Sequence, residues 1–94
     1  MYKERISIEV DHSRKIKISK EKYDQIKNYF DQHKAIAYGP GVFVDIYTNK
    51  RVPTLAIYQD DNFCWRKQLV YYFEKYGIIP PNEFLKKTFG WTVD

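Results

Sequence analysis

The hydrophobic period of this chain changes twice from two residues to about 3.6, and this constrains the fold more than any other sequence feature. Apolar and polar residues alternate over positions 5–10 and again over 42–48. Such alternation is typical of strands that bury one face. A second alternating segment follows each of these, and helical spacing then begins, over positions 20–34 and 63–76. The pattern therefore predicts a strand pair followed by a helix in each half of the chain.

The first half contains a candidate hairpin. If Val10 pairs with Ile16 and Ile8 pairs with Ile18, the apolar side chains of both strands share one face. The residues between them, at positions 11–13, are of types that favour turns. We therefore expect a hairpin whose polar side chains point away from the core.

The helix after this hairpin has a well-defined start. Ser19 is a suitable N-cap for a helix at positions 20–34, because its hydroxyl can accept a bond from a free backbone N–H. The apolar stripe of this helix comprises Tyr23, Ile26, Tyr29 and Phe30.

The second half begins with the tripeptide 39–41, Gly-Pro-Gly, which predicts a loop. Strands are expected at positions 42–48 and 54–59, with Val44 opposite Ile57. This register would bury both of these side chains in the core.

The remaining segments read as two helices. The sequence Asp-Asp-Asn at positions 60–62 suits the start of a helix at 63–76, and Gly77 suits its end. A short helix is expected at positions 82–89, ended by Gly90.

These elements predict a single compact α+β domain over residues 1–94. Their order is ββα-ββα-α, which gives a mostly antiparallel four-stranded sheet with helices packed on one face. The repeated order suggests a degenerate internal duplication, although the residues themselves do not repeat.

Composition excludes several classes of protein. The single cysteine, Cys64, allows no internal disulfide framework, which favours a cytoplasmic location. No apolar run approaches the roughly 20 residues that span a membrane. His12 and His33 have no neighbours that suit a metal site or a catalytic base, and no phosphate loop is present. The sequence therefore predicts a non-enzymatic protein without a metal or cofactor.

A basic cluster is the first candidate binding site. Five cations fall close together in the sequence: Arg14, Lys15, Lys17, Lys20 and Lys22. Beside the free N–H groups of a helix start, such cations can hold the phosphates of a nucleic acid. The alternative is a solvated surface that keeps an edge strand from aggregating.

An aromatic face is the second candidate. In the expected register Phe43 lies opposite Tyr58, with Tyr47 nearby, on the side away from Val44 and Ile57. Exposed aromatic rings on a sheet can stack on the bases of single-stranded nucleic acid. Alternatively, the C-terminal segment with its own aromatic residues covers this face.

The third candidate is the apolar stripe of the helix at positions 63–76. It comprises Trp65, Leu69, Tyr72 and Tyr76. The stripe is either enclosed between the sheet and the last helix or exposed as a homodimer or protein-partner surface.

The sequence thus favours a small binding or regulatory protein. Its frequent Lys, Ile, Tyr and Asn match AT-rich codons, which favours a phage or mobile-element origin. Two mechanisms stay open: binding of nucleic acid through the basic and aromatic residues, or docking on an acidic protein surface as a stoichiometric inhibitor of a host protein.

Overall fold

The computed structural model describes residues 4–94. The elements, in chain order, are β1 (Ile6–Ile8), a 3-10 turn (His12–Arg14), α1 (Lys20–Gln32), β2 (Ala37–Val44), β3 (Arg51–Gln59), β4 (Phe63–Arg66), α2 (Lys67–Tyr76) and α3 (Asn82–Phe89). The predicted α+β class is confirmed. The predicted order of elements differs in detail. Strands form within or over the predicted ranges 5–10, 42–48 and 54–59, but no strand forms at 15–18 and β4 takes the place of the start of the second predicted helix.

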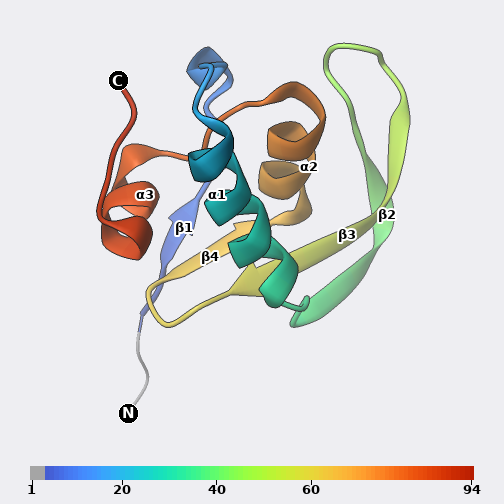
Figure 1. Cartoon of the computed structure of the whole chain (residues 1–94). Helices are drawn as coiled ribbons and strands as arrows, with labels where there is room; N and C mark the ends of the chain where they lie inside the picture. Colours follow the sequence, from blue (N-terminus) through green and yellow to red (C-terminus); the bar gives the residue numbers. More distant parts are fainter. Residues whose placement is uncertain (1–3) are drawn as a thin grey trace.

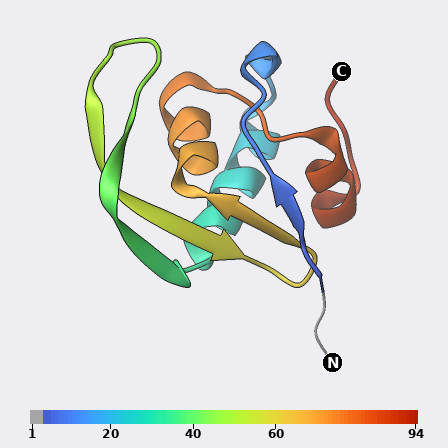
Figure 2. The ribbon, with the colours of Figure 1, turned by 180° about the vertical axis from the view of Figure 1, so that it is seen from behind.

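The described strands form one mixed sheet in the order β1-β4-β3-β2. β1 runs parallel to β4, with Ile6 beside Phe63 and Ile8 beside Trp65, while the other two pairings are antiparallel. Figure 1 shows α1 lying across β4 and β3, and in Figure 2 these strands pass in front of it. The first and last thirds of the chain therefore meet in the sheet.

The predicted N-terminal hairpin is not formed. β1 ends at Ile8, and the next residues make a 3-10 turn in which Asp11 accepts a bond from the backbone N–H of Ser13 at 3.0 Å. Ile16 and Ile18 lie outside the named strands but still pack against the core. Pairing with β4 replaces the hairpin, because it buries Ile8 beside the buried aromatic residues Phe63 and Trp65.

The Gly-Pro-Gly tripeptide lies within β2 and is not a loop. Gly39 pairs with Leu55 and Val42 with Pro53, so β2 contains one residue more than β3 between these pairs. This is a β-bulge, and Gly41 adopts the φ of 128° that it requires. Pro40 is tolerated because β2 is at the edge of the sheet.

The faces of β2 are opposite to those predicted. Phe43 is 9% exposed, whereas Val42 and Val44 are 44% and 45% exposed. Val42 and Val44 also pair with Pro53 and Arg51, so the predicted register of this hairpin is wrong. The strand is apolar on both faces, and the larger ring of Phe43 gains more free energy from burial than either valine.

A strand also replaces the start of the second predicted helix. Phe63 and Trp65 of β4 point into the core, while Cys64 and Arg66 between and after them do not. The carboxylate of Asp60 accepts bonds from the backbone N–H groups of Asn62 and Phe63. These two hydrogen bonds stabilise the turn between β3 and β4 and do not cap a helix, because α2 begins only at Lys67.

Local helix signals were predicted correctly. The Ser19 hydroxyl accepts a bond from the Lys22 backbone N–H at 3.2 Å, and α1 ends at Gln32. α3 occupies the predicted residues 82–89. Gly77 and Gly90 end α2 and α3 in the left-handed region, with φ of 71° and 84°.

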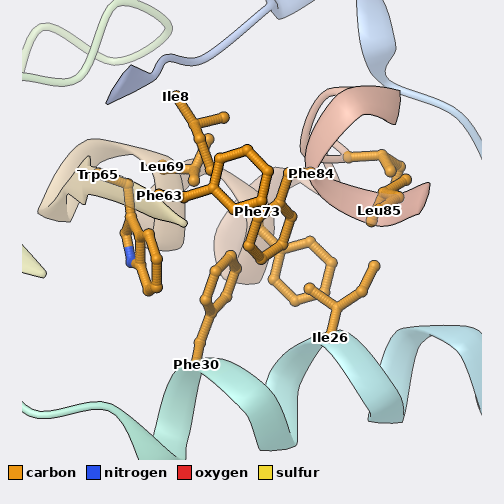
Figure 3. Packing of buried hydrophobic residues seen from close by; sticks show 10 residues of the cluster. Ile8, Ile26, Phe30, Phe63, Trp65, Leu69, Phe73, Phe84 and Leu85 are labelled. Atoms are coloured by element: carbon orange, nitrogen blue, oxygen red, sulfur yellow. The ribbon is translucent and has the colours of Figure 1, made fainter. Parts of the chain in front are cut away.

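All three helices contribute to one core on one face of the sheet. Figure 3 shows Ile26 and Phe30 pointing from α1 toward Phe73 of α2 and Phe84 of α3. The buried members of this cluster are Ile8, Ile26, Phe30, Phe63, Trp65, Leu69, Phe73, Ile79, Phe84 and Leu85. Most of the predicted α2 stripe is therefore core: Trp65 and Leu69 lie in this cluster, where Trp65 contacts Phe30 of α1 and Phe84 of α3, and Tyr72 is buried against Phe43. Tyr76 is half-buried.

Candidate functional site

Arg14 of the basic cluster is used by the fold. Its guanidinium donates to the carbonyl oxygens of Ile79 and Pro80 at 3.3 and 3.2 Å, and to Asn82 Oδ1 at 2.8 Å. It also lies 3.4 Å from the Val93 carbonyl oxygen. Arg14 therefore ties the turn after β1 to the segment before α3, and its donors are not free for a ligand.

Two of the lysines also have intramolecular partners. Lys20 forms an ion pair with Asp24 at 2.9 Å, and the Lys22 ammonium lies 5.0 Å from the centre of the Trp91 ring. Both contacts are at the surface, where each contributes little to stability. They nevertheless lower the density of free positive charge in the cluster.

Lys15 and Lys17 are the members of the cluster that stay free within the described residues. Both are exposed, while Ile16 and Ile18 between and after them are half-buried against the core. Their predicted direction, away from the apolar face, is thus confirmed even though this segment is not a strand.

The three aromatic residues do not form one exposed face. Phe43 is buried in edge-to-face contact with Tyr71 of α2, and their ring centres are 5.2 Å apart. Tyr58 is half-buried and stacks on Trp65, where burial raises the pKa of its hydroxyl. Only Tyr47 keeps an exposed ring. The expected stacking platform is therefore wrong, and α2, not the C-terminal segment, provides the cover.

Tyr47 belongs to a polar cluster around Asp45. The Asp45 side chain is fully buried and accepts bonds from the hydroxyls of Tyr71 at 2.7 Å and Tyr76 at 2.5 Å. The backbone N–H groups of Tyr47 and Thr48 donate to its other oxygen. These bonds join the loop after β2 to the last turns of α2.

The hydrogen bonds determine the protonation state of Asp45. Burial alone would raise the pKa of this carboxyl, but the bonds from Tyr76, Tyr71 and two backbone N–H groups outweigh it and lower the pKa to about 2. In return, the same carboxylate raises the pKa of Tyr76 to about 12. Asp45 is thus a charged anchor with occupied oxygens, and it is not available for acid–base chemistry near neutral pH.

We also searched the described residues for a metal site, for hollows and for a membrane-spanning helix. Within residues 4–94, no group of three or more His, Cys, Asp or Glu side chains could hold a metal ion. A hollow of about 250 Å³ lies between the ends of β1 and β4, beside His12, Arg66 and Tyr72. No helix in the described part of the chain is long and apolar enough to cross a membrane.

An exposed apolar surface lies on the β2–β3 hairpin, on the side away from Phe43 and its contact with α2. We call it the outer face and define it by the paired residues Ala37 and Ile57, Val42 and Pro53, and Val44 and Arg51. Ile57 is 44% exposed, close to the values of the two valines, and Pro53 and Ala37 are also exposed. Within the pairs, only Arg51 is charged.

Basic side chains stand at both ends of the outer face. Arg51 lies at the tip beside Val44, and Arg66 of β4 lies at the base beside Ile57. Both are exposed, and neither forms an ion pair within the described residues. Lys67 also extends to the hairpin and donates to the carbonyl oxygen of Pro53 at 3.0 Å.

Sequence reasoning missed this surface, although a signal was present. Residues 42–44, Val-Phe-Val, are apolar at three successive positions, and such a strand must either bury both faces or expose one. The predicted register buries Val44, whereas the structure buries Phe43 and exposes both valines.

Comparisons with protein-family models, with curated proteins and with solved structures find no match for this chain.

Proposed function

We propose that the protein is a non-enzymatic binding module that docks on an acidic protein surface through the outer face of its β2–β3 hairpin. The observation that carries this proposal is the group of exposed side chains that lies between Arg51 and Arg66, namely Val42, Val44, Pro53 and Ile57. The Gly39–Leu55 pair lies between them, and Leu55 is half-buried against the cluster around Phe43. Exposed apolar side chains that gather on one side of a hairpin, with charged residues beside them, are typical of protein-binding surfaces. A stoichiometric inhibitor or regulatory subunit would use such a surface.

The chemistry of the face favours protein over nucleic acid. Valine, isoleucine and proline offer no ring on which a base can stack, whereas they pack well against aliphatic side chains of a partner. The cations at the rim would attract carboxylates of the partner and speed their encounter.

Nucleic-acid binding is the second candidate, and one observation favours it. Lys15 and Lys17 are both exposed, lie two residues apart and form no ion pair within the described residues. Two free lysines and the exposed ring of Tyr47 make a small site compared with the surfaces that bind nucleic acid strongly.

An affinity experiment with matched variants separates the two candidates. The immobilised protein is exposed to a nuclease-treated extract of the cells that produce it. Val44→Glu with Ile57→Glu disrupts the outer face, and Asn28→Glu with Gln32→Glu makes the same change in charge at exposed positions of α1. Lys15→Glu with Lys17→Glu tests the basic segment.

We expect the wild type and the α1 control to retain a protein from the extract that the outer-face variant does not retain. Retention of the same protein by the outer-face variant would overturn the proposal. A ligand that is lost on nuclease treatment, on raising the salt and in the Lys15 and Lys17 variant would instead establish nucleic-acid binding.

A further inference from the structure

We infer, on the basis of the proposed function, that the partner's contacting element is an amphipathic helix with an apolar stripe and with carboxylates near both of its ends. The width and length of the outer face, its open edge at β2 and the position of its charges all favour such a helix.

The apolar part of the outer face is two strands wide. Beyond β3 the same side of the sheet carries Arg66 and Cys64 on β4 and Ser7 on β1, and none of these is a large apolar side chain. Two strands spaced about 4.8 Å apart give a strip roughly 10 Å wide. A helix has a similar diameter of about 10 Å, whereas a packed sheet would need a broader apolar surface.

The length of the strip also suits a helix. From Ile57 to Arg51, β3 rises by about 3.3 Å per residue, which gives a length of roughly 20 Å. A helix of about 13 residues covers that length and presents an apolar stripe of three to four turns. The hairpin extends beyond β4, as Figure 1 shows, so its distal half is a two-stranded ribbon.

Strand addition at the edge of β2 is the competing mode, and the bulge opposes it. Pro40 has no N–H to donate, and the extra residue between Gly39 and Val42 breaks the regular spacing that an added strand needs. Such features are those by which proteins keep an edge from pairing. The face of the hairpin is therefore the available surface.

The charges select the sign of the partner. Arg51 and Arg66 stand at opposite ends of the strip, and no carboxylate lies among the paired residues that define it. A second copy of this chain would bring the same cations to the contact, so self-association through the outer face is disfavoured. A helix with Glu or Asp in its first and last turns complements both ends.

Three pools of synthetic 14-residue peptides test the inference. The first pool is stapled into a helix, carries mixed aliphatic residues on one stripe and has Glu in both end turns. The second has the same composition in strict apolar–polar alternation, and the third is the stapled helix with Lys in place of Glu. Binding is measured by fluorescence anisotropy, and amide chemical shifts locate the contact.

The acidic helix pool is expected to bind at least about tenfold more tightly than either control pool. Val44→Glu with Ile57→Glu should abolish this binding, and Arg51→Gln with Arg66→Gln should weaken it about fivefold or more and flatten its salt dependence. The Asn28 and Gln32 variant is the control that should bind as the wild type does.

Tighter binding of the alternating pool, or shifts confined to the β2 edge, would overturn the helix assignment. Absence of binding by all three pools would overturn it as well. A different result would contradict the proposed function itself. That result is retention, by the outer-face variant, of the protein that the wild type captures from the extract.

Discussion

Asp45 shows how one buried charge can be kept by its neighbours. Its carboxylate is removed from water, and the donors that replace water come from Tyr71, Tyr76 and the loop that Asp45 itself begins. Because its pKa is lowered in the folded state, this group stabilises the fold fully above its ordinary pKa, near 4. That contribution is lost as the pH falls from about 4 toward 2.

An acid-titration experiment checks this anchor. We expect Asp45→Asn to be less stable than the wild type at pH 7, with the difference shrinking between about pH 4 and pH 2, because only the wild type loses a carboxylate there. Urea unfolding midpoints across this range provide the measurement. A difference that stays constant down to pH 2 would show that the lowered pKa of Asp45 does not contribute.

Tyr76→Phe tests the same network from its other side. Removing this hydroxyl takes away a donor to the carboxylate, so the pKa of Asp45 should rise toward its ordinary value. The wild type should also show one tyrosine that ionises near pH 12, and this step should disappear in Tyr76→Phe. Ultraviolet absorbance follows the ionisation directly.

At the scale of elements, the two faces of β2 differ in what they contribute. Phe43→Ala should cost about 3 kcal/mol of unfolding free energy, because it empties a buried site against α2. Val42→Ala and Val44→Ala should each change it by less than about 1 kcal/mol, because both side chains are exposed. Denaturant unfolding of the three variants decides which face is buried, and the reverse ranking would invert the assignment.

The ends of α2 and α3 depend on backbone conformation rather than packing. At Gly77 and Gly90 an added methyl group would meet no atom within 4 Å, so any cost comes from the left-handed backbone. We therefore expect Gly77→Ala and Gly90→Ala each to lower stability by about 1 kcal/mol. A neutral result from thermal unfolding would mean that the helix ends rearrange without cost.

Elements were predictable where their signals are local. Ser19, Gly77 and Gly90 act within a few residues of their own position, and the helix ends they predict are present. The partner of β1 was not predictable in this way, because it lies far along the chain. Phe63 and Trp65 suit both a strand and the first turn of a helix, and the choice is decided by pairing with β1 and with β3.

At the scale of the whole molecule, the surface divides into regions that matter differently for folding. Lys15→Glu with Lys17→Glu should leave the unfolding free energy within about 1 kcal/mol of the wild type, since both side chains are exposed. Ile18→Glu is the contrasting variant, and it should destabilise the fold because Ile18 packs against the core. Equal effects of the two changes would mean that this segment is oriented differently.

The candidate site was harder to predict than the fold. A run of positive charges such as that around Lys15 is visible in the sequence. The intramolecular partners that neutralise some of these charges, such as Asp24 for Lys20, cannot be predicted from composition. The outer face depends on a single bulge at Gly39–Val42 and on the position of α2. Both are consequences of tertiary packing, and residues 42–44 are apolar at every position, so their pattern does not show which side is covered.

The parallel pairing of β1 with β4 has a consequence for the order in which this protein can fold during synthesis. Ribosomes add about 5–20 residues per second, so Phe63 follows Ile6 out of the ribosome after a delay of about 3–11 s. During that delay β1 has no partner, and the apolar stripe of α1 has no sheet to cover. The nascent chain must therefore keep its N-terminal half from aggregating until the third quarter of the sequence emerges.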